Sequence, residues 1–325
     1  MEAAVVTRRS RESSPGDVDD TLSALWRDVA REAPVARALM ANLIVLREAP
    51  AAGDLGIPLD EVMRRHPSRV IVLRHALGQA KICGPSSASV SILTFGPSHA
   101  RYGVEEIVVR SACADASLPS IVRRLTRGDV PASLWWAEDL SRVAPIRALT
   151  EMARQLVFDS RQWRDVHGAV RALAPLLDDP DAPELADVNW RRLTSMRYAV
   201  VHAASTMLPG ARTLERVEVH HRPGERALAW LLVGWLAARL RWPDGPRKAT
   251  IQEVRHNDDV LSVTCDGIVI SMNASRIVAK SEKGRLAFQV AARQESVADA
   301  VIAELSTLAP DRCLPDALRA LAAGL

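Results

Sequence analysis

The sequence lacks most of the features that mark metal proteins, secreted proteins and membrane proteins. Among its 325 residues there are four cysteines, and none forms a CxxC pair or lies at zinc-finger spacing from a histidine. The amino-terminal segment has no apolar stretch of the secretory type, and the most apolar segment, 227–242, is shorter than the roughly 20 residues that cross a bilayer. We therefore expect a cytoplasmic protein without metal or membrane contact, whose thiols stay reduced: Cys83, Cys113, Cys265 and Cys313.

Motifs that bind phosphate or position a nucleophile are also missing. The sequence contains no GxxxxGK[ST], no GxGxxG after a predicted strand, no HExxH and no GxSxG. Its basic residues are scattered, and a net charge of +3 is small for a protein that grips nucleic acid. We therefore expect no cofactor, no catalytic residues and no nucleic-acid partner.

The sequence does contain an alternation of strand and helix patterns between residues 17 and 178. Short apolar runs rich in β-branched residues predict strands over 42–48, 68–76, 88–96, 105–113, 132–136 and 156–160. Apolar residues at helical spacing predict helices over 17–32, 57–66, 118–128, 145–155 and 161–177. This alternation predicts an α/β domain, a largely parallel sheet with flanking helices, over 17–178. Residues 1–16 are polar and end in Pro-Gly, which predicts a disordered tail.

The alternation of strand and helix patterns ends at the acidic, proline-containing segment 178–187, which we interpret as a linker. Beyond it the patterns predict helices over 187–208, 225–242, 296–308 and 314–323, and strands over 214–222, 249–256, 260–273 and 285–293. Asp266 and Gly267 lie between two alternating runs and predict a type I′ hairpin. Residues 187–325 therefore predict an α+β domain with an antiparallel meander.

Bulky and charged side chains gather at the predicted carboxyl ends of strands in the first domain. Trp135 and Trp136 end one predicted strand, and Asp159 and Arg161 lie at the carboxyl end of the next. Ligands of open α/β sheets bind beyond the carboxyl ends of the strands, and Trp and Arg dominate protein interfaces. This edge is therefore our candidate site for a partner or ligand. In the alternative interpretation one Trp fills the core between sheet and helix, the other packs under a neighbouring helix, and Asp159 only caps a helix.

The start of the helix predicted over 187–208 offers a second group of candidates. Asn189, Trp190 and Arg192 lie there. Asn189 can cap the helix and Trp190 can fill the core, or all three can extend the same docking surface.

A third group lies at the opposite edge of the predicted sheet. His66, Pro67 and Arg69 stand at the amino end of their strand, which is the wrong edge for a doubly wound active site. Proline is tolerated there because the first residue of a strand need not donate to the ladder. We predict a structural turn in which Arg69 forms an ion pair.

Read in order, several segments resemble the glucose-6-phosphate dehydrogenase assembly proteins, the OpcA family. The resembling stretches include "HPSRVIVL", "LPSIVRRLTRGDVPASLWW", "LVFDSR", "DVNWRRLTSMRYAVVHA" and "LLVGWLAARLRW", and the resemblance covers roughly residues 40–245. It implies a non-catalytic bacterial protein that binds glucose-6-phosphate dehydrogenase, promotes its active oligomer and supports NADPH supply through the oxidative pentose phosphate pathway. Members from photosynthetic bacteria are associated with thiol redox control, but Gly103 and Val104 stand where the resemblance implies cysteine.

The resemblance and the missing catalytic motifs point to the same hypothesis. We predict an allosteric activator that docks on the dehydrogenase through the residues of the carboxyl edge. The alternative is a sensor or enzyme that binds a sugar phosphate or nucleotide at this edge, with Arg161 and Arg192 holding the phosphate, because pairs of guanidinium groups suit phosphate geometry.

Overall fold

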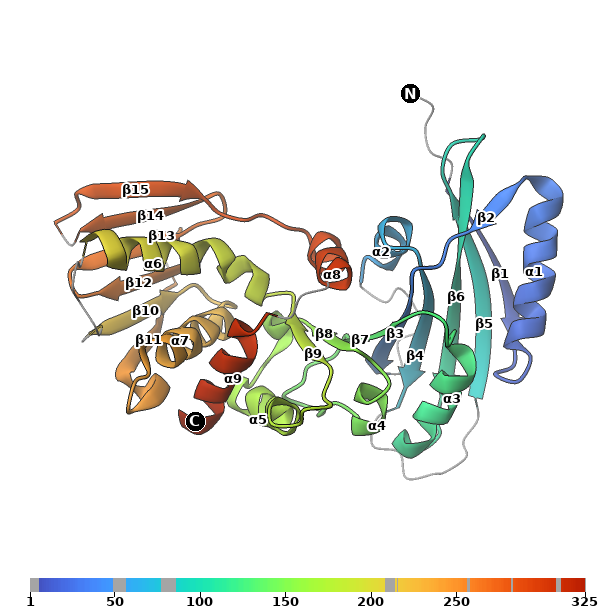
Figure 1. Cartoon of the computed structure of the whole chain (residues 1–325), viewed down its shortest axis with the longest axis horizontal. Coiled ribbons are helices and arrows are strands. Elements are labelled where there is room, and N and C mark those ends of the chain that lie inside the picture. Colours follow the sequence, from blue (N-terminus) through green and yellow to red (C-terminus); the bar gives the residue numbers. More distant parts are fainter. Residues whose placement is uncertain are drawn as a thin grey trace.

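The computed structural model describes residues 6–48, 57–76, 86–207, 214, 216–255, 258–281, 283–307 and 311–324, which form two sheets with helices packed around them (Figure 1). The first sheet has nine strands in the order β1-β5-β6-β4-β3-β7-β8-β9, with β2 paired to β6. Every pair from β6 to β9, and the β2 pair, is parallel; only β1, β5 and β6 pair antiparallel. The strands are β1 (Thr7–Ser13), β2 (Val35–Arg37), β3 (Ala41–Glu48), β4 (Ser68–His75), β5 (Ser86–Phe95), β6 (Arg101–Ser111), β7 (Ala132–Trp136), β8 (Gln155–Phe158) and β9 (Glu184–Asp187). The predicted largely parallel sheet is confirmed.

Helices cover both faces of this sheet, and so its central strands are apolar on both sides. On β3, Leu43 and Val45 face one core, whereas Ile44 and Leu46 face the other, because neighbouring residues of a strand point to opposite faces. Helices α2 and α8 lie on the first of these faces, and α3, α4 and α5 lie on the second (Figure 1). Helix α1 packs against β5. These helices are α1 (Val18–Glu32), α2 (Leu59–Arg65), α3 (Leu118–Leu125), α4 (Arg147–Thr150), α5 (Val166–Leu177) and α8 (Val297–Ser306).

The prediction of a disordered tail is wrong for residues 7–13. They form β1, which pairs antiparallel with the outer strand β5. Its three arginines form ion pairs: Arg8 with Asp60 and Glu106, Arg9 with Glu32, and Arg11 with Asp28. Backbone pairing with an open sheet edge and these ion pairs replace the apolar burial that the tail lacks.

The second sheet is the predicted meander with one added strand. Its order is β11-β10-β12-β13-β14-β15, with β10 and β11 parallel and the other pairs antiparallel. Asp266 and Gly267 have φ values of 42° and 87°, which confirms the predicted type I′ hairpin. The sequence patterns missed β14 as a separate strand. The strands are β10 (Val217–His221), β11 (Ala249–Glu253), β12 (Leu261–Cys265), β13 (Ile268–Met272), β14 (Arg276–Ser281) and β15 (Leu286–Ala291).

The carboxyl-terminal helices connect the two sheets. Helix α6 (Thr194–Met207) packs on the second sheet, while α9 (Cys313–Gly324) packs on both α5 and α7 (Arg226–Leu240). The α7–α9 contact is close because Gly234 has no side chain: a Cβ there would lie 2.7 Å from the carbonyl oxygen of Ala317. The predicted linker 178–187 holds β9, so part of it belongs to the first sheet. None of the helices formed by the described residues has the length and apolarity to span a membrane.

Candidate functional site: an arginine-lined cleft

A cleft of about 680 Å³ lies where the carboxyl ends of β8 and β9 meet the second sheet. Its wall carries four arginines and two glutamates. Arg161 follows β8, Arg192 follows β9, Arg222 and Glu225 lie between β10 and α7, and Arg293 and Glu295 lie between β15 and α8. We call it the arginine cleft.

The β8 side of the cleft is built on Asp159. Its carboxylate caps the short 3₁₀ helix Ser160–Gln162 by accepting the backbone N–H of Arg161 at 3.1 Å. The same carboxylate accepts the Nε of Arg161 at 2.9 and 3.0 Å and its Nη2 at 2.5 Å. Hydrogen bonding to Asp159 raises the pKa of Arg161 above its usual value, although burial opposes it. The guanidinium is therefore fixed in one orientation at the cleft wall.

The β9 side is built on the buried carboxylate of Asp187. One oxygen accepts the backbone N–H groups of Ser160 at 3.0 Å and Asn189 at 2.9 Å, and so it joins the ends of β8 and β9. Burial, followed by repulsion from Asp159, raises the pKa of Asp187 to about 7, while these hydrogen bonds oppose the rise. Its other oxygen has no hydrogen-bond partner in the described part of the chain.

A chain of polar contacts continues from β9 to the second sheet. Asn189 donates to the Oγ of Ser160 at 2.9 Å and accepts from Arg192 at 2.8 Å. Arg192 also donates twice to Glu225, at 2.7 and 2.9 Å, and Arg222 donates to the same carboxylate at 3.1 Å. Burial acts to raise the pKa of Glu225, but the two arginines outweigh it and bring the pKa below its usual value.

The third side of the cleft, between β15 and α8, also pairs arginine with glutamate. Arg293 donates to Glu295 at 2.8 Å, and Glu295 also accepts two hydrogen bonds from Arg191, at 2.9 and 3.0 Å. Arg191 reaches in turn to Glu304 of α8 at 2.7 Å. Each arginine of the cleft is therefore held by a carboxylate.

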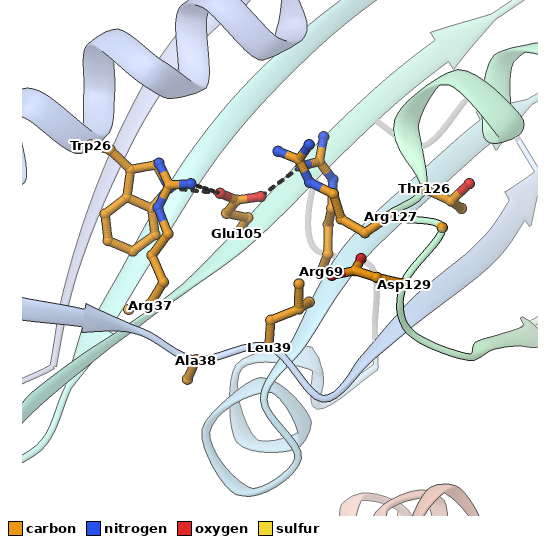
Figure 2. A pocket seen from close by; sticks show the side chains of 11 residues that line it. Trp26, Arg37, Ala38, Leu39, Arg69, Glu105, Thr126, Arg127 and Asp129 are labelled. Atoms are coloured by element: carbon orange, nitrogen blue, oxygen red, sulfur yellow. Dashed lines mark hydrogen bonds and ion pairs between the residues drawn. The ribbon is translucent and has the colours of Figure 1, made fainter.

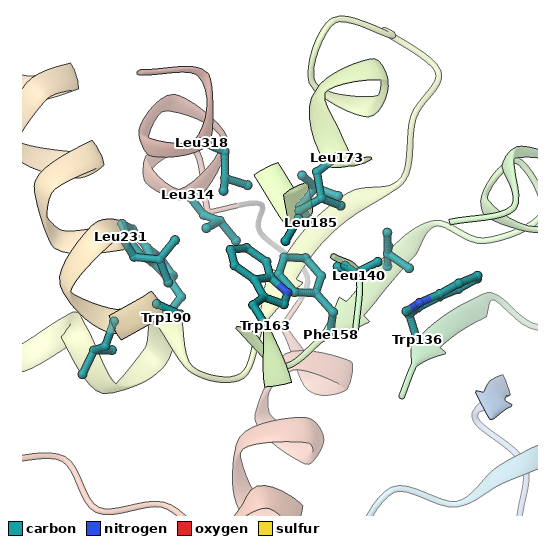
Figure 3. Close-up of a cluster of buried hydrophobic side chains, with 14 of the residues drawn as sticks. Trp136, Leu140, Phe158, Trp163, Leu173, Leu185, Trp190, Leu231, Leu314 and Leu318 are labelled. Carbon is teal, nitrogen blue, oxygen red and sulfur yellow. The ribbon is translucent and has the colours of Figure 1, made fainter. Parts of the chain in front are cut away.

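The predicted docking role of the paired tryptophans is wrong. Trp135 is 2% exposed and Trp136 is fully buried. They point to opposite faces of the first sheet: Trp135 joins the core under α2 and α8, and Trp136 joins the core that includes Leu140 and Phe158 (Figure 3). Both lie in the interior, and so neither forms part of a surface that a partner could contact.

Asn189 and Trp190 are also interior residues, with exposed fractions of 1% and 3%. Asn189 makes the contacts to Ser160 and Arg192 given above. The indole N–H of Trp190 donates to Asp311 at 2.7 Å, and the guanidinium of Arg197 lies over its ring at 4.1 Å. Of the seven residues predicted at this edge, Arg161 and Arg192 line the cleft, and Asp159 orients Arg161.

The turn at the opposite edge has the geometry of a structural element. His66 ends α2 and shares a hydrogen bond of 2.9 Å with Ser68, and Pro67 precedes β4. Arg69 is 1% exposed and donates to Glu105 at 2.8 Å and to Asp19 at 3.0 Å.

Arg69 lines a separate cavity of about 640 Å³, which we call the amino-edge pocket. Glu105 stands at its centre and accepts the indole N–H of Trp26 at 2.7 Å on the side opposite Arg69 (Figure 2). Arg37 lies over the Trp26 ring at 4.5 Å. These contacts tie α1 to β4 and β6.

Sequence reasoning missed Arg222, Glu225, Arg293 and Glu295. They come from connections of the second domain, and no local pattern places them opposite β8 and β9. The only signal was weak: Arg222 and Glu225 separate a strand from the most apolar helix of the chain.

Packing leaves no free space for a side chain at Gly103, one of the two positions where the family resemblance implies cysteine. A Cβ at Gly103 would lie 2.5 Å from the Trp26 ring, which covers the strand there. Val104 is 1% exposed. Cys265 and Cys313 form no disulfide within the described part of the chain, and burial raises the pKa of Cys265 to about 11. Cys83 lies outside the described residues.

The chain is a two-unit protein: an α/β unit is followed by an α+β unit, and a charged cleft lies where the two meet. Residues 59–175 match the domain described as "Glucose-6-phosphate dehydrogenase subunit N-terminal domain", and residues 183–318 match the corresponding C-terminal domain. The two matches follow one another in the order of the two sheets. The chain belongs to the OpcA family of glucose-6-phosphate dehydrogenase assembly proteins.

Three cyanobacterial relatives are similar to part of the chain. A protein of Nostoc punctiforme is 27% identical over 187 residues, which are 56% of this chain and 40% of the relative. One of Synechocystis sp. is 25% identical over 127 residues, 38% of this chain and 26% of the relative, and one of Synechococcus elongatus is 23% identical over 188 residues, 56% and 41%. Each of the three carries the description "Putative OxPP cycle protein OpcA". The chain thus matches less than half the length of these curated relatives.

Proposed function

We propose that the chain is a non-catalytic partner of glucose-6-phosphate dehydrogenase that favours the active oligomer of that enzyme. The observation that carries the proposal is the match of both halves of the chain to domains described as parts of a dehydrogenase subunit. Such a partner shifts a population by binding the active form more tightly than the inactive form. A tenfold shift needs a preference of only about 1.4 kcal/mol.

The paired tryptophans are buried, and so the docking surface that we propose lies elsewhere. An apolar groove of about 600 Å³ runs between α6, the end of α7 and the start of α9. Tyr198 and Val201 on α6 line it with exposed fractions of 74% and 56%, which are large for apolar side chains. We propose that the dehydrogenase docks here.

The charges along this groove indicate what the dehydrogenase must present. Arg197 and Arg239 line it beside a single carboxylate, Asp311. Asp311 lies 3.8 Å from Arg197, and burial lowers the pKa of Arg197, so its charge is only partly compensated. Arg239 contacts the thiol of Cys313 at 2.7 Å. An apolar segment of the dehydrogenase that carries acidic residues would complement the groove.

Mixing the chain with the dehydrogenase of the same organism is expected to increase the mass of the dehydrogenase oligomer and to raise its activity. Light scattering after size-exclusion chromatography measures the first effect, and steady-state NADP reduction measures the second. Serum albumin at equal concentration is the control. If oligomer mass, substrate affinity and maximal rate all stay unchanged, the proposed function is wrong.

Val201→Glu is expected to weaken dehydrogenase binding about tenfold or more, because it places a charge in an apolar contact that also carries acidic partner residues. Leu286→Glu is the matched control, since Leu286 on β15 has the same exposed fraction of 56%. Both variants should unfold like the wild type because both sites are exposed. Biolayer interferometry against immobilised dehydrogenase measures the affinities. Equal losses in both variants would contradict docking in this groove.

A further inference from the structure

We propose that the arginine cleft binds a small phosphate ester whose body carries hydroxyl groups. This site is independent of the docking groove and of the proposed activation of the dehydrogenase. It would be a ligand-binding site of this chain alone, and so it can be tested without the partner.

Unused N–H donors are the first argument. In the described part of the chain, the Nη1 atoms of Arg161, Arg222 and Arg293 have no hydrogen-bond partner, and neither has the Nε of Arg192. The four side chains are 35%, 45%, 42% and 25% exposed, respectively. Each guanidinium therefore keeps donor capacity on a side that solvent reaches, and planar forks of this kind suit phosphate oxygens.

Fixed orientation is the second argument. Asp159 holds Arg161 through three side-chain contacts, and Glu225 holds Arg192 and Arg222 together. An anion that binds such groups does not have to immobilise long side chains, so less conformational entropy is lost on binding. Asp159 and Glu225 thus hold the three guanidinium groups in place before an anion binds.

Charge and size favour a phosphate ester over a free ion. Four arginines line the cleft, and three carboxylates bind them: the lining residues Glu225 and Glu295, and Asp159 behind Arg161. One positive charge therefore remains in surplus. Glu225 and Glu295 would repel a ligand that is negative throughout, but they can accept hydrogen bonds from hydroxyl groups. A volume of about 680 Å³ is far larger than a lone phosphate needs and falls in the usual range for small-molecule sites.

Two helices begin at the wall of this cleft. Glu225 is the residue before the first turn of α7, and Ser296 is the residue before the first turn of α8. The amino-terminal ends of both helices contribute partial positive charge there, which favours a bound anion.

The amino-edge pocket does not offer the same chemistry. Its arginines Arg37, Arg69 and Arg127 lie among three carboxylates, Asp19, Glu105 and Asp129, so the charges balance. The Arg69 guanidinium is already buried between two of these carboxylates. Surplus positive charge and accessible donors therefore single out the arginine cleft.

Isothermal titration of the isolated chain tests the proposal, with glucose 6-phosphate, glucose and inorganic phosphate as probes. We expect saturable binding of glucose 6-phosphate, no detectable binding of glucose, and binding of inorganic phosphate at least tenfold weaker than that of the ester. No binding of glucose 6-phosphate would overturn the proposal, and so would equal binding of glucose. Equal binding of inorganic phosphate would overturn the part of the proposal that concerns the hydroxylated body.

The cleft itself is tested by Arg222→Gln, which removes one accessible guanidinium and leaves Arg192 to hold Glu225. This variant is expected to bind glucose 6-phosphate about tenfold more weakly. Arg171→Gln, on the exposed side of α5, is the matched control and should bind like the wild type. Equal affinities of the two variants would place the ligand elsewhere. Circular dichroism of both variants excludes misfolding as the cause of a loss.

Discussion

Between pH 5 and pH 8, the wild-type protein is expected to lose about 2 to 3 kcal/mol of unfolding free energy that Asp187→Asn retains. Burial raises the pKa of Asp187 from 3.8 to about 7 in the folded state. Between these two values the folded protein binds more protons than the unfolded chain, so stability falls as the pH rises through that window. Asparagine carries no charge at either pH, and therefore the loss disappears in the variant.

The substitution keeps the local architecture. An asparagine oxygen can still accept the two backbone N–H groups of Ser160 and Asn189 that Asp187 now accepts. Its amide nitrogen takes the place of the carboxylate oxygen that has no hydrogen-bond partner among the described residues, which adds a cost that does not depend on pH. The difference between the two pH values, and not the absolute stability, is therefore the measured signal.

Urea unfolding of both proteins at pH 5 and pH 8, followed by tryptophan fluorescence, measures this difference. Asp181→Asn is the control, because Asp181 is an exposed carboxylate in the same region and should show the wild-type pH dependence. If Asp187→Asn and the wild type lose equal stability between the two pH values, Asp187 is already ionised in the folded protein and its burial does not control its charge.

Most strands of the first sheet could be predicted because they are buried on both faces. Runs such as 42–48 and 68–76 are continuous in apolar, β-branched residues, and that composition is typical of parallel strands under helices. Three strands of this sheet were missed: β1, β2 and β9. Strands β1 and β9 lie at the two edges of the sheet and carry few apolar residues, and β2 has only three residues. Edge strands form through backbone pairing, which leaves little trace in composition.

The interior position of Trp135 could not be predicted from its own neighbourhood. Alternation along the strand shows that Trp135 and Trp136 point to opposite faces, but not that both faces are covered. The face of Trp135 is covered in part by α8, whose Ala298 and Val301 lie in the same core and come from far along the chain. A long-range packing contact therefore decided between core and surface.

Only two of the four arginines that line the arginine cleft could be predicted from the sequence. Arg161 and Arg192 follow strands at the carboxyl edge, where an α/β sheet gathers its ligands. Arg222 and Arg293 reach the same space from the second sheet. Their approach depends on how the two sheets pack, because no spacing in the sequence connects them.

Trp136→Ala is expected to cost about 3 to 5 kcal/mol of unfolding free energy, because Trp136 is fully buried and its removal leaves a large cavity. Trp136→Phe should cost far less. Phenylalanine keeps most of the ring volume, and the substitution removes an indole N–H that has no hydrogen-bond partner in the described part of the chain. Chemical unfolding of the three proteins under the same conditions gives these differences.

Dehydrogenase binding separates a core role of Trp136 from a docking role. Where Trp136→Ala is still folded, it should bind the dehydrogenase as tightly as the wild type. Tyr198→Ala in the docking groove should show the reverse: unfolding free energy within about 0.5 kcal/mol of the wild type, but weaker binding, because Tyr198 is 74% exposed. A Trp136→Ala protein of wild-type stability that no longer bound the dehydrogenase would place this indole at the interface and contradict its burial.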